Sequence, residues 1–146
     1  MFRSAVAVLL ALSGASSMAQ MSPVGLWRTI SDKDGVAQSE VRIVDTAGVV
    51  SGKVEKITDP KAKPGEKCVE CKDERKDQPI LGMEILRGLK KVDGKDVWEG
   101  GTVVEPATGT VYRAKVTPID GGAKLEFRAY VGAPLFGRTA TWIRIQ

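Results

Sequence analysis

The sequence contains no histidine among its 146 residues. Histidine is the commonest general base of enzymes at neutral pH and the commonest neutral metal ligand. Its absence excludes Ser-His-Asp and Cys-His catalysis and a catalytic zinc site built on histidine. Four glutamates, Glu84, Glu99, Glu105 and Glu126, lie on or near expected strands, but nothing fixes the spacing that a glycosidase carboxylate pair requires. We therefore expect a protein that is not an enzyme and has no metal or cofactor.

Long apolar runs are also missing from the chain. The apolar run nearest the N-terminus, Val6–Leu12, is short; it follows the basic Arg3 and precedes the small-x-small sequence Ser17-Met18-Ala19. A run of this length cannot cross a bilayer as a stable helix, whereas the pattern is that of a secretory signal peptide. We expect cleavage after Ala19 and a periplasmic or secreted protein with no membrane span in its mature chain; an N-terminal membrane anchor is the alternative.

Cysteine is scarce too, with one pair in the pattern Cys68-Val-Glu-Cys71. In an exported chain two cysteines favour an intramolecular disulfide with a structural role. A redox-active pair is the second interpretation, although such pairs usually stand at a helix start in a βαβ fold, which is not indicated here. Metal binding is the third, and only carboxylates such as Glu66 and Glu70 could complete a closed site.

The basic and acidic residues show little separation along the chain. Loss of Arg3 with the signal peptide leaves a net charge of about +3, and residues 55–78 hold seven basic and seven acidic residues that cancel. A nucleic-acid-binding protein concentrates its basic residues on one face. We therefore expect no nucleic-acid partner.

Short alternating segments separated by turn-forming residues fill residues 20–146, and no long amphipathic helical period is present. This pattern predicts strands, and the sequence Asp93-Gly94 predicts a tight hairpin. The expected strands are Val24–Ile30, Val36–Val44, Val49–Ile57, Ile80–Leu89, Val97–Val104, Thr110–Thr117, Ala123–Val131 and Arg138–Ile145. The segment Met83–Arg87 is also compatible with a helical turn.

Eight strands joined mostly by short turns predict one all-β domain, an antiparallel barrel over residues 20–146. Closure would pair the first strand with the last and remove the exposed edges. Thr58–Pro79 holds three of the seven prolines and both cysteines. A loop of this length is usually functional or tied down.

The few aromatic residues are candidates for a ligand pocket. Small-molecule sites are mostly apolar with a few polar groups that orient the ligand. We expect Trp98, Tyr112 and Phe127 to line such a pocket, with Arg128 or Arg138 at its mouth. The alternative is that the aromatic side chains only pack the core and that the arginines lie on solvated strand faces.

Five motifs carry a resemblance to a known family. They are Gly25-Leu-Trp27, the Cys68–Cys71 pattern, Trp98-Glu-Gly-Gly101, Glu105-Pro-Ala-Thr-Gly-Thr-Val-Tyr112 and Phe136-Gly-Arg-Thr-Ala-Thr-Trp142. The chain resembles the bacterial domain-of-unknown-function family 2147 (DUF2147) over nearly all of residues 20–146. The resemblance implies a small exported protein with a lipocalin-like barrel and no particular activity.

Glycine and tryptophan in the first strand and a late arginine are also similar to the wider calycin group, the lipocalins and their relatives. There the tryptophan packs beneath an arginine of the last strand and closes one barrel end. The resemblance implies this role for Gly25, Trp27 and Arg144, with Arg138 as the alternative arginine and Trp142 beside Arg144 on the last strand. The lipocalin Thr-Asp-x motif and C-terminal helix are absent from the sequence, which argues against lipocalin-type ligand transport.

Three functions remain open at this point. The first is a non-enzymatic barrel that binds a small apolar or amphipathic ligand. The second is a thiol-disulfide protein that uses Cys68 and Cys71. The third is a structural envelope protein whose barrel is filled by its own side chains, since an eight-stranded barrel can be filled or can hold one small ligand.

Overall fold

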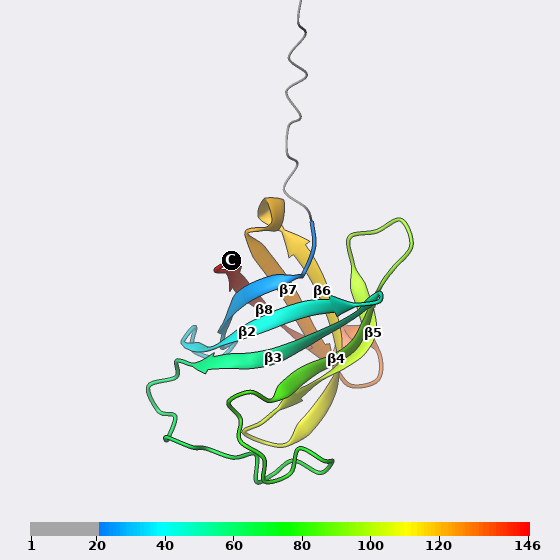
Figure 1. Ribbon diagram of the computed structural model, residues 1–146. Coiled ribbons are helices and arrows are strands. Elements are labelled where there is room, and N and C mark those ends of the chain that lie inside the picture. The colour runs from blue at the N-terminus through cyan, green and yellow to red at the C-terminus, as the bar shows by residue number, and fades with distance from the viewer. Residues whose placement is uncertain (1–20) are drawn as a thin grey trace, which may run out of the picture.

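The computed structural model describes residues 21–146, so the expected signal peptide lies outside the described residues. The described chain forms a closed antiparallel barrel in which each strand pairs with the next and β8 pairs with β1 (Figure 1). The strands are β1 (Gly25–Ile30), β2 (Ala37–Thr46), β3 (Val49–Ile57), β4 (Glu84–Lys91), β5 (Trp98–Glu105), β6 (Thr110–Ile119), β7 (Lys124–Tyr130) and β8 (Gly137–Arg144). Two single-turn 3-10 helices, η1 (Asp120–Gly122) and η2 (Pro134–Phe136), lie in the turns on either side of β7.

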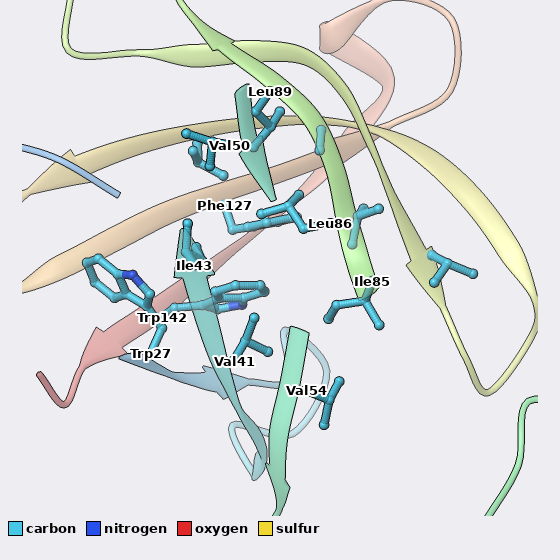
Figure 2. Packing of buried hydrophobic residues seen from close by; sticks show 14 of the residues in the cluster. Trp27, Val41, Ile43, Val50, Val54, Ile85, Leu86, Leu89, Phe127 and Trp142 are labelled. Atoms are coloured by element: carbon cyan, nitrogen blue, oxygen red, sulfur yellow. The ribbon is translucent and has the colours of Figure 1, made fainter. Parts of the chain in front are cut away.

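Alternation along the strands builds the core. Successive side chains of a strand point to opposite faces, so every second residue enters the barrel. Val41 and Ile43 of β2 and Val50 of β3 are fully buried in this way. Leu86 and Leu89 of β4 are also fully buried although they are three residues apart, because the β3–β4 register shifts between them. Figure 2 shows such side chains converging inside the barrel. The expected all-β barrel, with its first and last strands paired, is confirmed.

The fourth strand begins later than predicted. The sequence pattern predicts Ile80–Leu89, whereas β4 spans Glu84–Lys91. Gly82 has a φ of 86°, a left-handed backbone that ends regular pairing. The residues before β4 still bond to β3, since the Gly82 amide donates to Val54 O at 2.7 Å and the Val54 amide to Met83 O at 2.9 Å.

Antiparallel order places the strand ends at two opposite ends of the barrel. At one end lie the β2–β3 and β4–β5 hairpins, η1 and the C-terminus; at the other lie the β5–β6 hairpin, the β7–β8 connection and the long segment 58–83 (Figure 1). We call the first the closed end and the second the open end. Within residues 21–146, no helix has the length and apolarity to cross a membrane.

Candidate ligand-binding cavity

A cavity of about 280 Å³ lies inside the open half of the barrel. This volume is near the lower bound of small-molecule sites, about 300 Å³. The strands contribute apolar side chains to its wall: Ile30, Val54, Ile57, Ile85, Val103, Val104, Tyr112, Phe127, Ala129, Ala140 and Trp142. The long segment adds Asp59, Ala62, Glu66 and Ile80. The cavity is therefore an apolar chamber in the barrel that the long segment partly covers.

An aromatic pair lines the inner part of this chamber. The rings of Phe127 on β7 and Trp142 on β8 stack with centroids 4.3 Å apart and planes 15° apart (Figure 2). Both side chains are buried. Stacked rings hold each other in one orientation, so they present a fixed apolar surface to the cavity.

A charged cluster stands at the mouth. Arg138 Nη2 donates to Glu105 Oε2 at 2.9 Å, and Arg138 Nε lies 3.7 Å from Asp32 Oδ2. Its guanidinium is also 5.6 Å from the ring centre of Tyr112. The bond to Glu105 raises the pKa of Arg138, and the nearby Asp32 charge adds to this effect. Arg138 is thus a fixed cation whose charge is largely neutralised by its two carboxylate neighbours.

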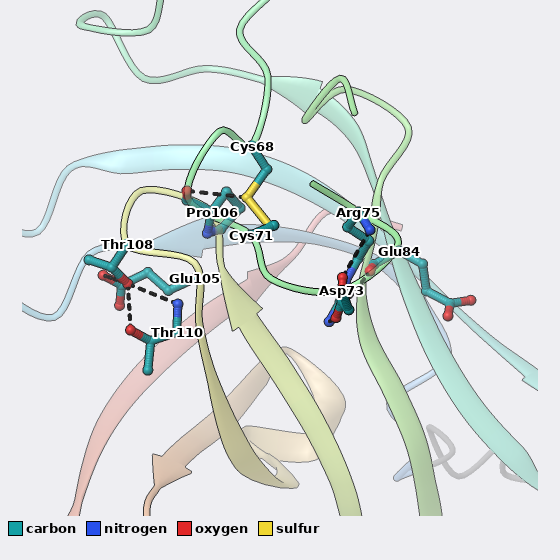
Figure 3. Close-up of a disulfide and its surroundings, with 9 residues drawn as sticks. All are labelled: Cys68, Cys71, Asp73, Arg75, Glu84, Glu105, Pro106, Thr108 and Thr110. Atoms are coloured by element: carbon teal, nitrogen blue, oxygen red, sulfur yellow. Dashed lines mark hydrogen bonds and ion pairs between the residues drawn. A yellow bond between two sulfur atoms is a disulfide. The ribbon is translucent and has the colours of Figure 1, made fainter. Parts of the chain in front are cut away.

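The disulfide fastens residues 58–83, the segment that we call the cap. The bond between Cys68 and Cys71 that the sequence favours is present and both residues are buried (Figure 3). Cys68 Sγ lies 3.5 Å from the carbonyl oxygen of Pro106 in the β5–β6 hairpin. Gly109 of that hairpin comes even closer: a Cβ there would stand 1.9 Å from Glu70 O. Glycine at this position thus allows the β5–β6 hairpin to pack against the loop that the disulfide closes.

A buried arginine provides the second anchor of the cap. Arg75 is 6% exposed; its Nη1 donates to Glu84 O at 3.0 Å and its Nη2 to the Asp73 carboxylate at 2.5 Å (Figure 3). The bonds that the Arg75 guanidinium and the Arg75 amide donate to the Asp73 carboxylate lower the pKa of Asp73 from 3.8 to about 2. Glu74 forms an ion pair with Arg87 on β4. The cap is therefore tied to β4 by charge as well as to the hairpin by packing.

Three of the five expected pocket residues line the cavity: Tyr112, Phe127 and Arg138. Trp98 does not. It is the first residue of β5, pairs with Lys91 and Val116, and lies in the closed half of the barrel. Val103 and Val104, five and six positions further along β5, line the cavity instead.

Arg128, the alternative to Arg138 for the mouth, does not line the cavity. Because Phe127 points inward, its neighbour points outward. Arg128 Nη1 donates to Thr139 Oγ1 at 2.7 Å and its Nη2 donates to Leu135 O at 3.3 Å. It therefore braces the β7–β8 connection from outside the barrel.

The closed end is built around Arg144. Its guanidinium lies 4.3 Å from the ring centre of the fully buried Trp27. Its nitrogens donate to four backbone oxygens: Gly122 O at 2.6 Å, Val24 O at 2.7 Å, Ser22 O at 2.6 Å and, more weakly, Gln146 O at 3.5 Å. Arg144, and not the alternative Arg138, is therefore the arginine that lies over Trp27. Burial lowers the pKa of Arg144.

Two further residues of the expected closure differ in role. Gly25 has no room for a side chain, because a Cβ would stand 2.4 Å from Gln146 O and 2.5 Å from Arg144 Nη1. Trp142 belongs to the cavity and not to the closed end, since it stacks on Phe127. Trp142 precedes Arg144 by two residues, so its side chain points to the same inner face but lies closer to the open end.

Sequence reasoning missed the polar rim of the cavity. Asp32, Asp59, Glu66 and Glu105 all line it. Glu105 lies in a motif that the sequence singled out, but the other three stand in loops without periodicity. In residues 21–146 no group of three or more Cys, Asp or Glu side chains is placed to hold a metal ion.

The comparisons with known proteins agree with this architecture. A family model described as "Uncharacterized protein conserved in bacteria (DUF2147)" matches residues 25–144. Among solved structures, the chain is similar to protein HP1028 from the human pathogen Helicobacter pylori, which is described as belonging to the lipocalin family. The TM-score is 0.74 at 20% identity, over 87% of this chain and 85% of that one. No curated protein matches.

Proposed function

Because the chain belongs to the bacterial DUF2147 family and folds as a lipocalin-like barrel with a cavity, we propose that it is an exported, non-enzymatic protein that binds a small amphipathic molecule. The cavity carries this proposal. Its aromatic and aliphatic wall suits an alkyl or ring system, and the charged cluster at Arg138 suits a polar head that stays near water.

The charge of the rim favours one kind of head. Four carboxylates, Asp32, Asp59, Glu66 and Glu105, face one guanidinium among the residues that line the cavity. Arg138 is already bonded to Glu105, so an anionic head would have to displace that pair. A cationic head gains from the surplus of negative charge without breaking a bond.

The other two functions are less well supported. A barrel filled by its own side chains leaves no chamber, whereas here a cavity remains beside Phe127 and Trp142. Thiol exchange needs an accessible sulfur, whereas Cys68 and Cys71 are 0% and 2% exposed. A stable disulfide also suits an oxidising compartment, which supports export.

Titration calorimetry with three decyl amphiphiles tests the proposal. Decylammonium should bind more tightly than decanol, and decanol more tightly than decanoate. Glu66→Gln should weaken decylammonium about two- to fivefold, the range for a single partly exposed charge pair, and leave decanol unchanged. If none of the three binds, the cavity proposal is wrong; if they bind equally, only the head-group preference is wrong.

A cavity-filling variant supplies the structural control. Ala140 lines the cavity, so Ala140→Phe should abolish binding of all three amphiphiles. Ala123→Phe places the same side chain at an exposed position beside η1 and should bind as the wild type does. Circular dichroism checks that both variants are folded.

A further inference from the structure

The connection between β7 and β8 exposes three large apolar side chains. Val131 is 63% exposed, Leu135 81% and Phe136 75%. Exposed apolar residues are normal when scattered, but several gathered on one protrusion indicate an interaction site. We call residues 131–136 the apolar tip.

The tip is held in place by its neighbours. Pro134–Phe136 form η2, and the Phe136 amide donates to Ala133 O at 3.0 Å. The outward Arg128 donates to Leu135 O at 3.3 Å. These hydrogen bonds satisfy backbone polar groups of the connection. The side chains of Leu135 and Phe136 remain exposed to solvent, so the apolar surface is accessible.

Basic residues lie on the outer barrel face just behind the tip. Ala114 and Val116 are fully buried inside the barrel, so the alternating Arg113 and Lys115 of β6 face outward. Arg113 pairs across the sheet with Tyr130, and Lys115 with Arg128. Among the described residues neither Arg113 nor Lys115 forms an ion pair.

Two acidic residues, Glu99 and Glu126, share the outer face with this patch. Glu99 of β5 lies opposite Lys115, where the β5–β6 register shifts. Glu126 is one outward position beyond Arg128 toward the closed end, opposite Thr117 and Thr141. Glu105 and Asp32 of the mouth are occupied by Arg138. On this outer face the three basic residues Arg113, Lys115 and Arg128 therefore outnumber Glu99 and Glu126, which leaves a net positive charge.

We propose that the apolar tip docks the protein on an anionic phospholipid bilayer. Leu135 and Phe136 enter the boundary between head groups and acyl chains, and Arg113, Lys115 and Arg128 meet the lipid phosphates. Apolar insertion combined with basic residues is the physical basis of reversible membrane-surface binding. The charge of the patch selects an anionic surface over a zwitterionic one, and the tip stands at the open end, where the cavity has its mouth.

Vesicle co-sedimentation of the chain without its first 19 residues tests the proposal. Phosphatidylglycerol–phosphatidylcholine vesicles should bind the protein, binding should weaken as salt rises, and pure phosphatidylcholine vesicles should bind at least tenfold less. Leu135→Ser with Phe136→Ser should weaken binding about tenfold or more. Arg113→Glu with Lys115→Glu should do the same and remove the salt dependence.

A matched control separates the tip from apolar exposure in general. Val44→Ser with Val49→Ser removes two exposed valines, 42% and 37% accessible, from the hairpin at the closed end and should leave vesicle binding unchanged. Equal loss in the control, or no vesicle binding by the wild type, overturns the proposal. A dimer that the tip substitutions dissociate, in the absence of vesicle binding, overturns it in favour of a second copy of the chain.

Discussion

Arg144 spans three parts of the chain, since it donates to the N-terminal segment and to η1 while it covers Trp27. Removal of the indole takes a large apolar group out of the core, so Trp27→Ala should destabilise the fold by about 3–5 kcal/mol. Arg144→Ala should cost about 1–3 kcal/mol, because burial of the ring exceeds the cation contact in energy. Denaturant unfolding measures both.

The two losses should not add, because they share one contact. We expect a coupling energy of at least about 0.5 kcal/mol in the double-mutant cycle. Lys91 and Trp98 supply a control cycle, since the exposed lysine lies 5.9 Å from that ring centre, and their coupling should be near zero. Equal coupling in both cycles would contradict a specific role for the Arg144 stack.

Asp73 makes the stability of the cap depend on pH. Its folded pKa of about 2 lies below the ordinary value of 3.8. A lowered folded pKa stabilises the protein above the ordinary value, and the contribution is lost as pH falls through the folded pKa. Asp73→Asn should therefore lower the melting temperature at pH 7, and the difference from the wild type should shrink between pH 4 and pH 2. A difference that stays constant over this range would argue against the Arg75 bond as the cause.

At the scale of elements, the contact between the β5–β6 hairpin and the cap depends on Gly109. Its φ is 70°, and a Cβ would strike Glu70 O. Gly94 in the β4–β5 hairpin has a φ of 72° with nothing within 4 Å. Alanine at either position suffers the same backbone strain, about 1 kcal/mol, and only Gly109→Ala adds a clash. Thermal unfolding should show the larger loss for Gly109→Ala, and similar losses would mean that the hairpin does not hold the cap.

The disulfide should affect the cap more than the barrel. Chain-entropy arguments give about 2 kcal/mol for so short a closed loop. Cys68→Ala with Cys71→Ala should cost roughly this much in denaturant unfolding. Trypsin should also cut this variant faster at Lys67 and Lys72, which flank the loop that the disulfide closes. Unchanged proteolysis would show that the other contacts of the cap hold it in place without the disulfide.

For the whole molecule, the seam between the first and last strands should open first. The β1–β8 register holds two residue pairs, Trp27 with Arg144 and Arg28 with Ile143, whereas β7–β8 holds seven. Fewer cross-strand bonds give less protection against local opening. Hydrogen exchange should therefore be faster at the Leu26 and Ile145 amides, which bridge the seam, than at amides in the middle of β7. Equal protection would mean that the barrel opens only by global unfolding.

Local sequence determined the strands of this protein. Alternation of apolar and polar residues fixes which side chains enter a barrel, and turn-forming residues fix where strands end. Val41, Ile43, Val116 and Phe127 lie inside as that pattern predicts. Gly25 and Trp27 also indicated the closed end, because they resemble a known motif.

Only the tertiary structure decided where along the barrel each inward residue stands. Alternation says whether a side chain points inward but not how far it lies from the mouth, so it could not separate Trp98 near the closed end from Tyr112 near the open one. Nor could periodicity place Glu66 and Ile80 over the cavity, since the cap has no repeating pattern. The cap is positioned by tertiary contacts, those of the disulfide with Pro106 and of Arg75 with Glu84. Position along the barrel axis and coverage of its mouth arise from closure and long-range packing, which no local segment encodes.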